Sequence, residues 1–298
     1  MTKKFSFGLI LVFLLTGCAE NKGREIVDRS GRTVTINNSI NRIVSTAPSN
    51  TEIIADLGMA HKLVAIDRHS ANVSGIPAGL VMLDFFYPDA EVILNLSPDI
   101  IIASGHNPTG SGEDPFSLLR EAGIPVVYIS MSRSITDIYR DIAFIADLLQ
   151  VQKEGEELVE TMKAQIAEIT NRLAHNEKRT VYFEISAAPD MITFGKDSFI
   201  DDMISVIGAD NIFGNDNWLV NPGAESIIER NPDVILTSVN YIDDPIGEIK
   251  SRPGFNHINA VINNRIYQID NDSSSRPSSR IILALRQMAQ AVHWELYD

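Results

Sequence analysis

Two glutamates occupy matching places in a segment that the sequence contains twice. YPDAEVILNLSPDIII begins at Tyr87 and NPGAESIIERNPDVIL begins at Asn221, which places Glu91 in the first copy and Glu225 in the second. Two carboxylates can share acid–base or glycosidic chemistry when they lie within about 10 Å of each other. We expect the two copies to belong to different lobes, with Glu91 and Glu225 at opposite tips. That arrangement would exclude shared catalysis.

The rest of the chain offers little that indicates an enzyme. Ser49 beside Asn50 resembles a nucleophile loop, but no histidine has a reason to lie next to it. The patterns Gly-x-Ser-x-Gly and His-Glu-x-x-His and the P-loop do not occur. We therefore expect a protein that is not an enzyme. A lipid-anchored envelope hydrolase and a surface adhesin without transport are the alternatives from other classes.

Composition describes an ordinary globular protein with enough apolar material for two lobes. The chain has 298 residues, of which 44% are hydrophobic and 21% charged. Its net charge of -14 argues against a nucleic-acid partner, because phosphate binding needs a basic face. An anionic small ligand stays compatible with this charge, since a few arginines can make one cleft locally positive.

The amino terminus indicates export. Two lysines precede an apolar run from Phe5 to Leu15 that is too short to span a bilayer, so residues 1–17 are predicted to be a signal peptide. The next letters, LTGC, look like a bacterial lipobox that ends at Cys18, the only cysteine of the chain. We expect Cys18 to carry lipid and to be the sole membrane attachment, on the cell membrane outer face or in the periplasm. An incidental cysteine in an ordinary signal peptide is the alternative.

Strand, loop and helix patterns follow one another along most of the chain. Apolar runs such as PDIIIAS and IPVVYIS are continuous rather than alternating, which is typical of parallel strands covered on both faces. We expect an α/β protein with an N-terminal lobe over residues 42–149 and a C-terminal lobe over 177–298. Residues 18–41 are polar and indicate a lipid-anchored tether followed by a short hairpin.

Residues 150–176 are predicted to form one linking helix between the lobes. Its apolar side chains recur at helical spacing: Leu158, Met162, Ile166, Ile169 and Leu173. A helix from Gln152 to His175 would be about 36 Å long at 1.5 Å per residue. A coiled-coil dimer is less favoured because so few heptads are present. We therefore expect a monomer.

Several strings in a fixed order carry a resemblance to a known family. They are RIVSTAPSNTEIIADLG, ITFGKDSFIDDMISVIGADNIF, RPGFNHINAVINNRIYQID and SRPSSRIILAL. Together they resemble the substrate-binding lipoproteins of ABC importers for ferric siderophores, haem and vitamin B12, the class III periplasmic-binding-protein family. The resemblance covers essentially all of the mature chain. It implies two Rossmann-like lobes joined by a single long α-helix, a ligand cleft between them, and no resident cofactor.

The resemblance also suggests a role for the repeated glutamates. Each Pro-x-Ala-Glu should open a short helix that leads into a strand, and a carboxylate in the first turn is favoured there by the helix dipole alone. For a matched pair, the family implies more: Glu91 and Glu225 would each dock into an arginine-lined pocket on one half of a dimeric ABC permease, which works with its ATPase subunits. Two contacts at a fixed separation make such docking bivalent.

The ligand should sit where parallel strands end, in the crevice between the lobes. A ferric siderophore, usually anionic with aromatic or hydroxamate faces, is the preferred ligand, and it would suit arginines beside aromatic rings. Arg276, in the serine-rich loop before the last helix, is the first candidate. The other candidates from both lobes are Arg68, His69, Phe85, Tyr87, His106, Arg133, Lys196, Trp218, Tyr241 and Asp272. A solvated surface base is the alternative for each cation.

Other chelates stay open as ligands. Haem would call for an axial histidine, methionine or tyrosine, for which His69, His106, Met131 and Tyr241 lie in plausible loops. Vitamin B12 would favour an aromatic, largely neutral cleft. A bare divalent metal needs three or four clustered histidines and carboxylates, and the six scattered histidines make direct metal ligation unexpected.

Overall fold

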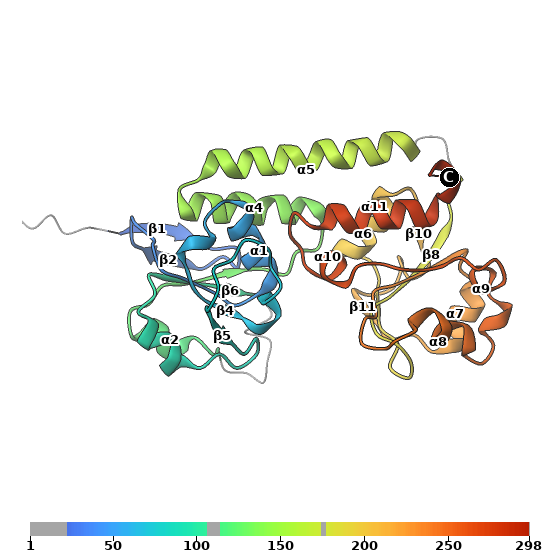
Figure 1. Cartoon of the computed structure of the whole chain (residues 1–298), viewed down its shortest axis with the longest axis horizontal. Helices are drawn as coiled ribbons and strands as arrows, with labels where there is room; N and C mark the ends of the chain where they lie inside the picture. The colour runs from blue at the N-terminus through green and yellow to red at the C-terminus, as the bar shows by residue number, and fades with distance from the viewer. Residues whose placement is uncertain (1–22, 106–113, 174–176, 298) are drawn as a thin grey trace, which may run out of the picture.

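Two α/β lobes lie side by side beneath one long helix, α5 (Gln152–Leu173), as Figure 1 shows. The computed structural model describes residues 23–105, 114–173 and 177–297. Cys18, the signal peptide and His106 lie outside the described residues. Both main sheets are parallel, so the predicted fold class is confirmed. None of the helices in the described ranges has the length and apolar character needed to cross a bilayer.

The N-terminal lobe is built on a five-stranded parallel sheet with the order β5-β4-β3-β6-β7. Its strands are β3 (Ile43–Ser45), β4 (Leu63–Asp67), β5 (Val81–Leu83), β6 (Ile100–Ser104) and β7 (Val126–Ile129). Its helices are α1 (Pro48–Asp56), α2 (Ala90–Leu96), α3 (Ser117–Glu121) and α4 (Ile135–Leu149), with 3-10 turns η1 (Ala60–Lys62) and η2 (Arg68–Ser70). Every residue of β6 and β7 is buried, which explains their continuous apolar sequence.

A hairpin precedes this lobe and covers one edge of its sheet. Strands β1 (Arg24–Val27) and β2 (Thr33–Ile36) pair antiparallel, and the turn between them uses Gly31 at a φ of +85°. The Asp28 carboxylate accepts a hydrogen bond from the Tyr128 N–H at 3.0 Å, and the Arg29 N–H donates to the Tyr128 carbonyl at 3.1 Å. Because β7 is the edge strand, these bonds satisfy groups that would otherwise be open to pairing with another chain.

The C-terminal lobe repeats the plan with a four-stranded parallel sheet in the order β10-β8-β12-β13. Its strands are β8 (Thr180–Glu184), β10 (Asp210–Asn211), β12 (Val234–Thr237) and β13 (Ile266–Gln268), and the short strands β9 (Thr193–Phe194) and β11 (Leu219–Val220) form an antiparallel pair. Its helices are α6 (Phe199–Val206), α7 (Ala224–Arg230), α8 (Pro245–Ser251), α9 (Asn259–Ile262), α10 (Asn271–Ser275) and α11 (Ile281–Val292), with η4 (Phe255–His257) and η5 (Trp294–Leu296).

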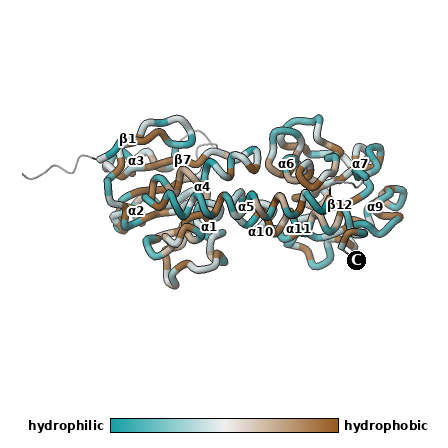
Figure 2. Tube along the Cα trace, turned by 90° about the horizontal axis from the view of Figure 1, so that it is seen from above, coloured by the Kyte–Doolittle hydropathy of each residue, from teal (hydrophilic) through white to brown (hydrophobic). Residues whose placement is uncertain are grey.

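Helix α5 binds the lobes together through its apolar stripe. Met162, Ile169 and Leu173 are buried in a core cluster that also contains residues of α1, α4 and α11, and the remaining stripe residues pack against it. Gly155 allows close contact with α4, because an added Cβ would lie 2.4 Å from the Ala146 methyl group. Figure 2, seen from above, shows α5 crossing from one lobe to the other. The lobes therefore share one continuous core rather than a loose hinge.

Each copy of the repeated segment forms a short helix followed by a strand, as predicted. The first copy forms α2 and β6, and the second forms α7 and β12. Both helices end in the left-handed region, at Ser97 with φ 45° and at Asn231 with φ 44°. Figure 1 shows α2 and α7 at opposite ends of the molecule, both on the side away from α5.

Candidate ligand-binding site

A cavity of about 370 Å³ lies between the lobes. Several strands end there: Ser104 and Ile129 close β6 and β7, while Ile185 and Ser238 follow β8 and β12. This is the edge where parallel α/β sheets bind ligands. The described lining residues are Ala47, Pro48, Ser49, Asn50, Phe85, Ser104, Ile129, Ser130, Met131, Ser132, Ile185, Phe194, Ser198, Phe199, Trp218, Ser238, Asn271, Ser274, Ser275, Arg276 and Pro277.

The lining combines aromatic faces with serine hydroxyls. The rings of Phe194 and Trp218 lie 5.3 Å apart on the C-terminal side, and Phe199 opens α6 next to them. Phe85 is the aromatic residue contributed by the N-terminal side. Among the described lining residues, Arg276 alone carries a formal charge. Such a surface suits apolar and aromatic ligand faces with a few hydrogen bonds to hydroxyls.

The charge of Arg276 is compensated by neighbouring carboxylates. Its Nη1 donates to Glu52 Oε1 at 2.9 Å, and its Nη2 lies 2.7 Å from Asp272 Oδ1. Nη2 also donates to the His69 carbonyl at 2.9 Å and to Asn72 Oδ1 at 3.0 Å. Only 7% of Arg276 is exposed. Arg276 lines the cavity, and these pairs offset the charge on which its expected attraction for an anionic ligand depended.

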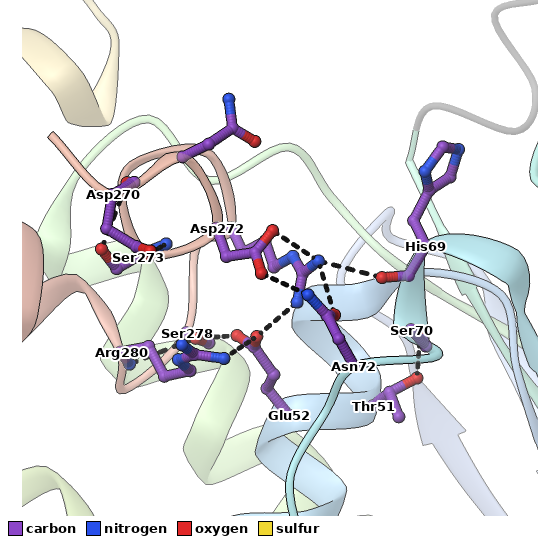
Figure 3. Close-up of polar contacts among 12 residues, drawn as sticks. Thr51, Glu52, His69, Ser70, Asn72, Asp270, Asp272, Ser273, Ser278 and Arg280 are labelled. Carbon is purple, nitrogen blue, oxygen red and sulfur yellow. Dashed lines mark hydrogen bonds and ion pairs between the residues drawn. The ribbon is translucent and has the colours of Figure 1, made fainter. Parts of the chain in front are cut away.

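Glu52 is the centre of this cluster and lies in α1. It is 2% exposed, and it also accepts hydrogen bonds from the Ser278 hydroxyl at 2.5 Å and from Arg280 Nη1 at 3.3 Å. Burial raises the pKa of Glu52, while the bonds from Ser278 and Arg276 act in the opposite direction. Figure 3 shows Glu52, Asn72 and Asp272, from different elements, with dashed lines running from each of them to a guanidinium group that lies between them.

The cavity brings together only part of the predicted set. Phe85 and Trp218 line it with Arg276, whereas Asp272 is engaged in the ion pair with Arg276. The other described candidates do not belong to the lining, and each is exposed: Arg68, His69, Tyr87, Arg133, Lys196 and Tyr241. The Tyr241 hydroxyl instead accepts a hydrogen bond from the Ala187 N–H at 2.8 Å. The six side chains are therefore exposed outside the lining, and long charged side chains of this kind keep their charged ends in solvent.

Two aromatic lining residues were not anticipated. Phe194 closes β9, and Phe199 begins α6 directly after Ser198, whose hydroxyl accepts from the Asp201 N–H at 3.1 Å. The Ser-x-x-Asp spacing predicts a helix start at this point. Strand ends and the helix starts that follow them lie at the cleft in α/β sheets. The Ser-x-x-Asp pattern could therefore have identified Phe199 as a residue that lines the cavity.

Similarity to known proteins assigns the chain to a family. The model of a family described as periplasmic binding protein matches residues 43–273. The chain belongs to this family. The assignment inferred from the sequence is thus confirmed, and with it the general function of a substrate-binding protein.

Three relatives illustrate the range of this periplasmic binding protein family. The uncharacterised ABC transporter substrate-binding lipoprotein YvrC of Bacillus subtilis is 28% identical, with 96% of this chain and 95% of that protein covered. A vitamin B12-binding protein of Vibrio parahaemolyticus is 23% identical, with coverage of 87% and 91%. The crystal structure of a possible iron-binding protein from Staphylococcus epidermidis superposes with a TM-score of 0.78 at 32% identity, covering 86% of this chain and all of that one.

Few side chains in the described part of the chain are placed to hold a metal ion directly. Within the described residues, no cluster of three or more histidine, cysteine or acidic side chains is placed to hold an ion. Met131 is the one described lining residue of the types that ligate haem iron axially.

Proposed function

We propose that this periplasmic binding protein captures a chelated metal outside the cytoplasm and delivers it to an ABC permease, and that a corrinoid such as vitamin B12 fits its cavity best. One observation carries the choice: the described lining holds no uncompensated charge, because Arg276 is paired with Glu52 and Asp272. A bulky, largely neutral chelate would bury its apolar faces against Phe85, Phe194, Phe199 and Trp218. The vitamin B12-binding relatives support this ligand class.

A ferric siderophore, the ligand preferred from the sequence, is the second candidate. The possible iron-binding protein of Staphylococcus epidermidis, at 32% identity, favours it. An anionic siderophore would need a free cation in the cavity, and Lys196, Arg68 and Arg133 lie outside the lining. A ferric hydroxamate without net charge is therefore the form of siderophore that we would expect to bind.

The remaining parts of the proposed function concern location and the permease. Cys18 in a lipobox-like sequence and the lipoprotein name of the Bacillus relative support a lipid anchor on the outer side of a membrane. Glu91 and Glu225 are exposed in the first turns of α2 and α7, and neither carboxylate makes a hydrogen bond or ion pair to another described residue. Both are therefore available to basic pockets on a permease dimer. We propose binding without catalysis.

A titration panel with the full-length protein tests the ligand. Cyanocobalamin, a neutral ferric hydroxamate, an anionic ferric catecholate and haemin would be compared by calorimetry and by tryptophan fluorescence. Trp218 lines the cavity, whereas Trp294, the second tryptophan, is stacked between Arg179 and Arg265 outside the lining. We expect cyanocobalamin to bind most tightly and to quench a signal that is lost in Trp218→Phe. Tightest binding of the catecholate, or binding of none of the four, would overturn the proposal.

A further inference from the structure

Next to the cavity, the two lobes are joined by charged and polar side chains that are far apart in the sequence. Four of them define what we call the interlobe joint: Glu52 and Asn72 from the N-terminal lobe, and Asp272 and Arg276 from the C-terminal lobe (Figure 3). Glu52 and Arg276 are 2% and 7% exposed. Their ion pair is therefore shielded from water, and solvent screens it weakly.

The joint closes a ring across the lobe boundary. Asp272 pairs with Arg276, Arg276 donates to Asn72 Oδ1, and Asn72 Nδ2 donates back to Asp272 Oδ2 at 2.6 Å. The links from Asn72 to Arg276 and to Asp272 both cross the lobe boundary, and each is a directional bond to a charged group. A rotation of one lobe against the other would break several of these bonds together and leave Glu52 buried beside a displaced partner.

The joint also reaches three segments that line the cavity. Asn50 lies two residues before Glu52 in α1, and Arg276 is itself part of the lining together with its neighbours in the chain. The third segment is reached through His69, whose carbonyl accepts from Arg276 and whose ring contacts the Phe85 ring edge-on at 6.1 Å. Displacing Arg276 would therefore loosen contributions to the cavity from both lobes.

We propose that Glu52 and Arg276 are positioning residues whose ion pair assembles the cavity before ligand arrives and holds α2 and α7 at a fixed separation. The proposal rests on the proposed function for its affinity readout but not for its distance readout. When the lobes are already ordered before ligand arrives, less of the binding free energy is used to order them. Without the joint, part of the protein would adopt arrangements of the two lobes that do not bind ligand. The apparent affinity falls in proportion to the fraction of protein molecules whose lobes are arranged for binding.

Spin labels on the two outer helices measure the separation directly. Cysteines would replace Asn95 in α2 and Glu229 in α7, both exposed, in the full chain carrying Cys18→Ser. Without ligand, we expect a single narrow distance distribution for the parent protein. Glu52→Gln and Arg276→Gln should each broaden it. They should also lower affinity for cyanocobalamin by about tenfold, as expected when the competent fraction falls to about a tenth.

A double variant separates positioning from general stability. Glu52→Gln with Arg276→Gln removes both buried charges, so it should recover part of the melting temperature lost in each single variant, while the distribution stays broad. Arg276→Lys keeps the charge but not the forked donor, and an intermediate width is expected. A double variant with a narrow distribution and parental affinity would overturn the proposal. If the parent protein binds no ligand, that result counts against the proposed function. The distance distributions would then decide by themselves whether the interlobe joint fixes the separation of α2 and α7.

Discussion

Asp99 and Asp233 occupy corresponding places in the two lobes and make the same reciprocal contact with the strand beside them. The Asp99 N–H donates to the Arg42 carbonyl at 2.8 Å, and its carboxylate accepts from the Arg42 N–H at 2.9 Å. The Asp233 N–H donates to the Thr180 carbonyl at 3.0 Å, and its carboxylate accepts from the Thr180 N–H at 3.0 Å. We refer to each pair as a strand latch.

The latches explain the second half of the repeat. Directly after them, Ile43 pairs with Ile100 in the first sheet and Val181 with Val234 in the second. Each latch thus fixes the register of two parallel strands at their amino ends, where a slip would turn buried side chains toward the wrong face. The repeated Glu and the repeated Asp therefore do different things: the glutamate is exposed, and the aspartate organises the sheet.

We predict that Asp233→Ala and Asp99→Ala each destabilise the protein by about 1–3 kcal/mol, because at least two donors lose their acceptor in each case. The latches lie in different lobes, so the two effects should add when both changes are combined. Urea unfolding followed by circular dichroism measures this. Asp243→Ala, at an exposed loop position, is the matched control. Equal stability of Asp233→Ala and the control would contradict the assigned role.

The stabilisation by Asp233 should disappear in acid. Burial alone would raise the pKa of Asp233, but hydrogen bonds from the Thr180 N–H and hydroxyl and from Asn259, together with the charge of Arg265, outweigh it and lower the pKa below its ordinary value of 3.8. A lowered pKa in the folded state means that the carboxylate stabilises the fold above pH 3.8 and that this contribution is lost as pH falls through the lowered value. The stability difference between the parent protein and Asp233→Ala should be constant near neutral pH and shrink below that point. A difference that grows on acidification would rule out this origin.

Large parts of this architecture could be predicted from local patterns. The stripe of Met162, Ile169 and Leu173 indicates a helix because burial of one face repeats at the helical period, and the structure buries these residues. Continuous apolar strands such as β6 and β7 indicate parallel sheets covered on both faces for the same kind of reason. Each of these signals is contained within a short stretch of chain.

The pairing of Arg276 with Glu52 could not be predicted in this way. The two residues are distant in sequence, and nothing in the serine-rich loop around Arg276 indicates that a buried carboxylate from α1 will meet it. Position at a strand or helix end selects a loop that lines the cavity, yet the electrostatic partner decides whether the arginine is available to a ligand. The same limitation applies to Lys196, whose loop neighbours Phe194 and Phe199 line the cavity in its place.

Phe85 and Phe86 form a natural pair for testing the cavity. They are adjacent in sequence, but Phe85 lines the cavity while Phe86 is 58% exposed and does not. We expect Phe85→Ala to weaken ligand binding by about 10- to 30-fold, the usual effect of truncating a buried aromatic contact. Phe86→Ala should change affinity less than about twofold, as expected outside the contact surface. Calorimetry with the ligand identified by the panel provides both numbers, and a larger loss for Phe86→Ala would show that the ligand sits elsewhere.

Charge reversal at both repeated glutamates should separate ligand binding from delivery. Glu91 and Glu225 are exposed and outside the cavity lining, so the double variant Glu91→Arg with Glu225→Arg should bind ligand as the parent protein does. In the proposed docking, each new arginine would face a basic pocket of the permease and be repelled by it. Uptake in proteoliposomes that contain the permease and its ATPase should therefore be abolished. A single reversal should leave partial uptake, because one of two linked contacts remains.

Glu154→Arg with Glu156→Arg is the control for that experiment, since it makes the same change in net charge on exposed residues of α5. Figure 1 places α5 on the side of the molecule opposite to α2 and α7. If docking uses the two repeated glutamates, this control should support normal uptake even though its total charge matches that of the inactive variant. Loss of uptake in both double variants would mean that overall charge governs the encounter with the permease. Loss of ligand binding in the Glu91 and Glu225 variant would instead assign these residues to the cleft and refute the docking role.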